Sequence, residues 1–236
     1  MRHAKSCSNH VRESSTTDDD TDPIIKIARS IRDPGLSVNG RQMAANYGTR
    51  LCRRLEAAGF ECGKALIASS GLRRAHETAR AVFGRDPITV RYFKESDTIP
   101  ERSSSYTTPN WRAFIKHLST LVTDNDHVAV VGHRSFLTNQ MWPSITGGKK
   151  YAGQVNNLDG VLIEGDIING GNLQISRVRE FKYNGAAPVK ISDKCSVPEQ
   201  ERYIQRKLRA HTRKMSAKQR VKRMTRTRKA KSRKLD

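Results

Sequence analysis

Side chains suited to phosphate chemistry recur at the points where apolar runs of this sequence end. They are Arg2-His3, Ser69-Ser70, Arg73-Arg74, Glu95 and Gly132-His133-Arg134. Guanidinium groups bind phosphate oxygens in a forked geometry, and an imidazole nitrogen can act as a nucleophile. A carboxylic acid can protonate a departing oxygen. This set is the inventory of a phosphoryl-transfer pocket, and none of its roles requires a metal ion.

Hydrophobic periodicity predicts the elements that would position these residues. Helices are expected over 37–58, 72–83, 111–122 and 135–142, and strands over 65–68, 88–93 and 127–131. Two further strands, 160–168 and 173–181, flank an Asn-Gly-Gly turn and predict a hairpin at a sheet edge. Alternating strands and helices predict an α/β fold with a mostly parallel sheet sandwiched by helices. Ligands of such sheets bind beyond the carboxyl ends of the strands, so these side chains should gather there.

Four segments, in order, resemble the motifs of one known family. Residues 2–9 (RHAKSCSN) resemble R-H-G-x-S-x-x-N, and residues 33–42 (DPGLSVNGRQ) resemble D-x-x-L-[ST]-x-x-G-x-x-Q. Residues 69–79 (SSGLRRAHETA) are similar to S-S-x-L-x-R-A-x-x-T-A, and residues 131–133 (VGH) resemble a second histidine motif. Over about residues 1–182 the chain therefore resembles the histidine phosphatase superfamily, which includes the cofactor-dependent phosphoglycerate mutases. The resemblance implies a phosphoglycerate mutase-like fold.

The resemblance also implies a role for each matching residue. His3 would be the nucleophile that forms a phosphohistidine, with His133 beside it. Arg2, Arg74 and Asn9 would bind the phosphate. Glu95 would be the proton donor to the leaving group, with Glu101 as the competing candidate. No cofactor and no metal ion is implied.

The sequence departs from the family pattern at three places. Ala4 stands where the family has glycine, and Arg134 follows the second histidine where a small residue is usual. The family also places an apolar central strand just before its Arg-His pair, whereas this sequence begins at Met1. We expect either a start further upstream or a defective sheet, because a central strand bonds to neighbours on both sides.

Charge divides the chain into three parts. The whole protein of 236 residues has a formal net charge of +21, and residues 201–236 alone hold 16 Lys and Arg against two acids. We expect a phosphatase-like domain over 1–183, a linker over 184–200, and a basic tail over 201–236 that is disordered or marginally helical. The tail is suited to non-specific nucleic-acid binding, to nuclear import or to docking on the acidic segment 14–22.

The cysteine pattern and the absence of long apolar runs indicate an intracellular protein, cytoplasmic or nuclear. The four cysteines form no Cys-x-x-Cys pair, so we expect reduced thiols and no disulfide framework. No run of residues is apolar and long enough to insert in a membrane.

Two functions fit the sequence. The first is a phosphoric monoester hydrolase: a metal-independent phosphatase that acts on a phosphomonoester through a phosphohistidine. The alternative is a catalytically inactive phosphatase-like binding module whose basic tail binds nucleic acid.

Overall fold

A three-stranded parallel sheet forms the centre of the computed structural model, which describes residues 1–17, 19, 21–90, 111–122, 126–168, 172–184 and 193–232. The strands are β1 (Leu66–Ser69), β2 (Ile88–Thr89) and β3 (Val128–Val131), in the order β2-β1-β3. β1 pairs with β3 from Leu66↔Val128 to Ser69↔Val131. All three lie within predicted strands or extend them by one residue, although the second half of the predicted strand 88–93 lies outside the described residues.

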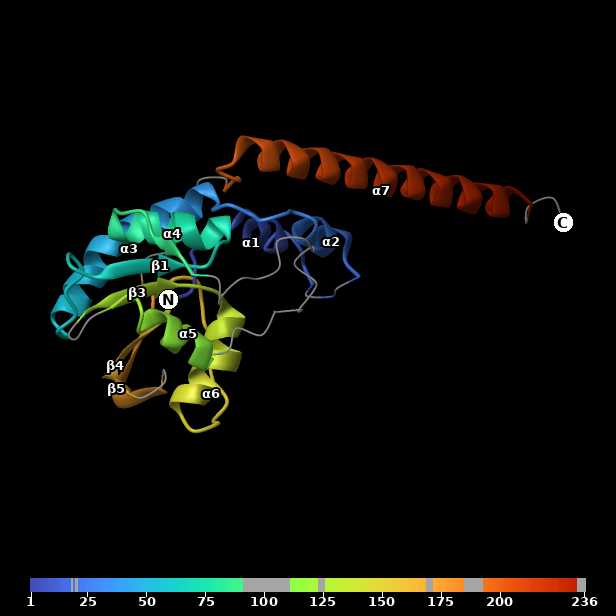
Figure 1. The fold of residues 1–236 in the computed structure, drawn as a ribbon. Helices are drawn as coiled ribbons and strands as arrows, with labels where there is room; N and C mark the ends of the chain where they lie inside the picture. The colour runs from blue at the N-terminus through green and yellow to red at the C-terminus, as the bar shows by residue number, and fades with distance from the viewer. Residues whose placement is uncertain are drawn as a thin grey trace.

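Helices cover both faces of this sheet, as the alternating pattern predicts. α3 (Val38–Glu56) and α4 (Arg73–Phe83) pack on one face, and their apolar side chains form one core cluster with Ile67 and Val131. α5 (Trp111–Leu118), the π-helix Phe136–Met141 and α6 (Trp142–Ile145) lie on the other side of the sheet (Figure 1). The α/β fold is therefore confirmed. The predicted helix 135–142 is a π-helix that continues into α6.

The first residues of the chain join the sheet to a hairpin. β4 (Gly160–Ile168) and β5 (Asn172–Phe181) pair antiparallel, which confirms the predicted hairpin, but they form a two-stranded sheet of their own and not the edge of the parallel sheet. Met1 to His3 run beside the end of β3, where the Gly132 amide donates to the Met1 carbonyl (2.9 Å) and the His3 amide to the Gly132 carbonyl (3.0 Å). On the other side the Arg2 amide donates to the Asp159 carbonyl (2.8 Å). These residues thus occupy a strand position at the carboxyl end of the sheet.

Hydrophobic periodicity did not predict two short helices. α1 (Cys7–Arg12) begins at a capping box in which Ser6 and Asn9 bond reciprocally, and α2 (Pro23–Arg29) is capped by the Asp22 side chain. Helices of six and seven residues span fewer than two turns, which is too short for an apolar stripe to repeat.

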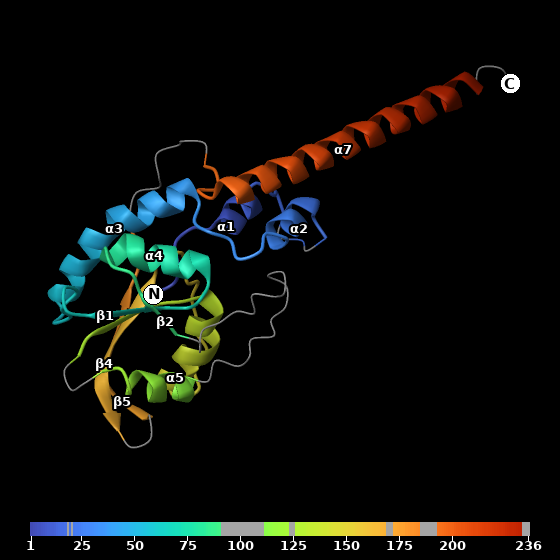
Figure 2. The ribbon, with the colours of Figure 1, turned by 45° about the horizontal axis from the view of Figure 1, so that its top comes forward.

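The basic tail is a helix whose first turns belong to the fold. α7 (Pro198–Ser232) begins inside the predicted linker and packs on α2 through the buried Ile204. The Tyr203 hydroxyl lies 2.9 Å from the Ser30 hydroxyl. Further along, α7 extends away from the body (Figures 1 and 2). The predicted tail boundary at 201 is therefore wrong, because the leading turns bury apolar side chains against α1 and α2.

The prediction of reduced thiols is also wrong. Disulfides join Cys7 to Cys195 and Cys52 to Cys62, with Cα–Cα distances of 4.9 and 5.7 Å. The first bond links residues 188 positions apart, which the docking of the segment before α7 brings together. Sequence spacing carries no information about such a contact. In the part of the chain that the structure describes, no helix is long and apolar enough to cross a membrane.

Candidate active site

Two predicted site histidines lie side by side at the carboxyl end of β3. The ring centroids of His3 and His133 are 5.3 Å apart and the ring planes are tilted by 58°. Both side chains are buried, with exposed fractions of 6% and 1%. The tertiary structure thus brings together residues 130 positions apart in the sequence, at the edge of the sheet where ligands bind.

The backbone around His3 is held on several sides. Its carbonyl accepts a hydrogen bond from Asn157 Nδ2 (2.8 Å), and the next amide, of Ala4, donates to Thr78 Oγ1 (2.9 Å). Gly40 lies so close to this loop that an added Cβ would stand 1.9 Å from the Lys5 carbonyl oxygen. These contacts from α3, α4 and the segment before β4 keep His3 in one place.

The hydrogen bond of the His3 ring defines its tautomer. His3 Nδ1 lies 2.7 Å from the carbonyl oxygen of Ala4, and a carbonyl only accepts, so Nδ1 carries the hydrogen. Burial, followed by the charges of Arg74 and Arg2, holds the pKa of His3 well below 6.5. At neutral pH the ring is therefore uncharged and its lone pair is at Nε2. This is the form that a nitrogen nucleophile requires.

His133 is neutral for the same reason. Its Nε2 and the Ser70 hydroxyl are 2.7 Å apart, at the point where β1 ends. Burial, then the charge of Arg74, then His3, holds the pKa of His133 well below 6.5. A neutral imidazole beside His3 avoids repulsion between two buried cations.

Two guanidinium groups, the buried Arg74 and the half-buried Arg2, supply positive charge to the site. Arg74, in the first turn of α4, is 3% exposed, and Arg2 donates to the Val155 carbonyl (2.5 Å). Burial and the nearby charge of Arg134 lower the pKa of Arg2 to about 10, while the buried carboxylate of Asp159 acts in the opposite direction. Cations that repel one another in a buried site favour the binding of an anion, because its charge relieves the repulsion.

The remaining predicted site residues have different outcomes. Asn9 Oδ1 accepts from the amide and the hydroxyl of Ser6, so the side chain closes the capping box of α1. Its phosphate contact stays a prediction. Glu95 and Glu101 lie outside the described residues.

Four supporting residues were not assigned a role from the sequence. Ser70 bonds to His133, and Thr78 accepts from the Ala4 amide. Asn157 donates to the His3 carbonyl, and the carboxylate of Asp159 acts to raise the pKa of Arg2. Ser70 and Thr78 fall inside the motif 69–79, which could have drawn attention to them. For Asn157 and Asp159 the sequence holds no comparable signal, because they lie in an irregular segment before β4.

Two solved structures are similar to this chain. YhfR of Bacillus stearothermophilus is 21% identical, and the match covers 74% of this chain and 92% of that one, with a TM-score of 0.48. A mutant phosphoserine phosphatase from Entamoeba histolytica, solved in complex with phosphoserine, is 15% identical over 75% of this chain and 93% of that one, with a TM-score of 0.45. No family model matches the sequence, and no curated protein matches it.

Proposed function

We propose that this protein is a phosphatase that cleaves phosphomonoesters through a phosphohistidine at His3, without a metal ion. The observation that carries the proposal is the bond between His3 Nδ1 and the Ala4 carbonyl, which directs the lone pair of a neutral ring to Nε2. The half-buried Arg2 and the buried Arg74, whose charges act on the His3 ring, support the binding of a dianionic phosphate.

The proposed reaction has two steps. His3 Nε2 attacks phosphorus, an N–P bond forms, and the P–O ester bond breaks as the leaving alkoxide takes a proton from a carboxylic acid. Water then attacks the phosphohistidine, loses a proton to the same carboxylate, and the N–P bond breaks to release inorganic phosphate. Arg2, Arg74 and His133 would surround the oxygens of the transferred group, whose charge is spread over three positions.

The proposal is tested first at the nucleophile. The purified protein, assayed with a chelator present, is expected to hydrolyse an aryl phosphate, and His3→Ala should abolish this activity. His117→Ala on α5, outside the site, is the matched control. Rapid quenching after reaction with phosphate-labelled substrate should trap an acid-labile label on the unmodified protein and none on His3→Ala. Thermal melting of both variants checks that they fold.

Activity that survives in folded His3→Ala would contradict the assignment of the nucleophile. Activity that is lost in the chelator and restored by a divalent ion would contradict the metal-independent mechanism. Tight binding of a phosphomonoester with no turnover would favour the alternative, a phosphatase-like binding module.

The proton donor is tested by comparing leaving groups. Glu95→Gln should slow the hydrolysis of alkyl phosphates by roughly 10²-fold and that of activated aryl phosphates much less, because only a poor leaving group needs the proton. Glu101→Gln is the matched control. If the leaving-group contrast appears in Glu101→Gln instead, the acid is Glu101. Equal losses for both substrates in both variants would exclude these two carboxylates as the donor.

A further inference from the structure

Residues 193–201 cross the segment that leads into α3, and we call them the strap. The Val38 amide donates to the Lys194 carbonyl (2.8 Å), and the Ser196 amide donates to the Leu36 carbonyl (3.1 Å). The strap therefore pairs antiparallel with this segment, which carries the second of the sequence motifs.

The same segment pairs on its other side with the loop that follows the nucleophile. The Ser37 amide donates to the Lys5 carbonyl (3.0 Å), and the Cys7 amide donates to the Gly35 carbonyl (2.8 Å). In addition, the disulfide between Cys7 and Cys195 joins this loop to the strap directly. The strap and the loop are thus two sides of one connected layer.

One buried carboxylate of the strap reaches the loop. The side chain of Asp193 is 7% exposed, and its Oδ2 lies 2.9 Å from Lys5 Nζ and 3.6 Å from His10 Nδ1. Its Oδ1 accepts from the amides of Asn39 (3.1 Å) and Lys194 (3.0 Å). Asp193 therefore connects the loop to the first turn of α3 as well as to the strap.

Asp193 is ionised at neutral pH. Burial raises the pKa of this carboxyl, but the bonds from Lys5 and from the Asn39 amide outweigh burial, so the pKa lies below its ordinary value. The Lys5 ammonium also contacts Glu13 Oε2 (2.5 Å), whose side chain is 60% exposed. Water screens an exposed pair, so Asp193 is the partner that fixes the Lys5 side chain.

Lys5 is joined to the nucleophile through a single peptide group. The Ala4 carbonyl, which accepts from His3 Nδ1 (2.7 Å), belongs to the same planar unit as the Lys5 nitrogen. If this peptide rotated, the ring would lose its acceptor and the hydrogen could move to Nε2. The lone pair would then leave the nitrogen that attacks phosphorus.

We propose that Asp193 is a positioning residue: through Lys5 it fixes the Ala4–Lys5 peptide and so keeps His3 in its reactive tautomer. The motif match covers residues 1–182 and assigns Asp193 no role. The expected effect on turnover rests on the proposed function, whereas the expected effect on the His3 ring does not.

The test measures the ring nitrogens of His3 by ¹⁵N NMR of the full chain, with His3→Ala to identify their signals. In the unmodified protein Nδ1 should appear as a protonated nitrogen and Nε2 as an unprotonated one. Asp193→Asn keeps an oxygen that can accept from the Asn39 amide but removes the ion pair with Lys5. In this variant the two signals should move toward each other, because the hydrogen is shared between both nitrogens.

Two controls separate positioning from other effects. Glu13→Gln removes the exposed carboxylate from the same ammonium and should leave the His3 signals in place. Ile115→Ala truncates a buried side chain of α5 and should lower the melting temperature without moving these signals. A shift in either control as large as that in Asp193→Asn would overturn the proposal.

The link through Lys5 is tested with a double variant. Lys5→Met should shift the His3 signals as Asp193→Asn does, and combining the two changes should add no further shift. Additive shifts would mean that Asp193 acts by another route, and unchanged signals in both single variants would mean that it does not act on His3. Either result overturns the proposal. Thermal melting checks that each variant folds.

The effect on turnover is read from the steady-state constants. In Asp193→Asn, kcat should fall roughly tenfold with KM nearly unchanged, because fewer rings are reactive while the phosphate-binding arginines are unaltered. A raised KM with kcat unchanged would overturn the positioning role. If the unmodified protein shows no turnover at all, the proposed function fails, and the NMR signals still decide this inference.

Discussion

The protonation state of His3 depends on neighbouring charges that a single substitution can remove. A nucleophilic imidazole must be neutral, so activity falls as the pH drops through the pKa of His3. Burial, Arg74 and Arg2 all lower that pKa, which extends activity to more acidic conditions. We predict that Arg74→Gln shifts the acidic limb of the kcat/KM profile to higher pH, because one of the two cations that disfavour the imidazolium is gone.

The neighbouring arginine provides the control for this prediction. Arg73 is exposed on α4 and bonds to Glu77 (2.8 Å), so Arg73→Gln should leave the acidic limb where it is. Both variants are compared with the unmodified protein on the same substrate, so that the ionisation of the substrate cancels. A limb that moves to lower pH in Arg74→Gln, or moves equally in Arg73→Gln, would contradict the electrostatic explanation.

At the scale of elements, the leading turns of α7 act as part of the core. Ile204 is 1% exposed among α1, α2 and the segment before α7. We predict that Ile204→Ala lowers the free energy of unfolding by about 3 kcal/mol, the usual cost of truncating a buried isoleucine. Met215, on the same helix and 47% exposed, is the matched control, and Met215→Ala should change stability by less than about 0.5 kcal/mol.

Denaturant unfolding measures both effects, with the Cys7–Cys195 bond intact. The disulfide joins residues 188 positions apart and holds the start of α7 near α1 even when Ile204 is truncated. Equal stability of the two variants would mean that α7 does not dock on α2 in solution.

At the scale of the whole molecule, the second half of α7 concentrates positive charge far from the site. Residues 218–236 contain ten Lys and Arg and one acid, and α7 reaches away from the body over much of this range (Figure 2). We propose that this half of α7 binds nucleic-acid backbones without sequence preference. If about six cations contact a duplex, the binding constant should fall roughly 10³-fold between 50 and 200 mM salt.

Truncation after residue 217 tests this proposal and leaves the docked turns in place. The shortened protein should lose most of its duplex binding at low salt while its melting temperature and phosphatase activity stay nearly unchanged. Filter binding or fluorescence anisotropy at several salt concentrations measures the slope. Equal affinity of the full and shortened proteins at low salt would contradict a role for this half of α7.

Local patterns in the sequence predicted much of the fold and the centre of the site. The stripe of α3, its Ser37 cap and the short apolar runs of β1 and β3 are properties of neighbouring residues, so they can be read before any tertiary contact is known. The motifs then placed His3, His133 and Arg74 at strand-to-helix junctions, where the structure has them.

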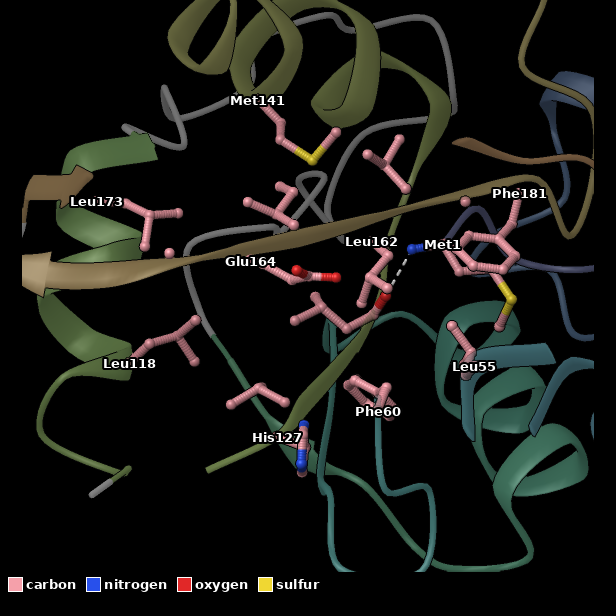
Figure 3. A pocket seen from close by; sticks show the side chains of 18 of the residues that line it. Met1, Leu55, Phe60, Leu118, His127, Met141, Leu162, Glu164, Leu173 and Phe181 are labelled. Atoms are coloured by element: carbon pink, nitrogen blue, oxygen red, sulfur yellow. Dashed lines mark hydrogen bonds between the residues drawn. The ribbon is translucent and has the colours of Figure 1, made fainter. Parts of the chain in front are cut away.

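Other features depend on contacts between residues far apart in the chain, and only the tertiary structure decided them. The Cys7–Cys195 bond, the burial of Ile204 and the support of His3 by Asn157 each join segments more than 150 residues apart. The cavity between β3 and β4 is of the same kind, because its walls come from α3, β3, β4 and α5 together (Figure 3). The sequence by itself determined most of the helices and strands, and it placed a pair of histidines beside arginines at strand ends. The burial of these elements and histidines, and the residues they pack against, depend on contacts over long sequence separations. No local pattern encodes such contacts.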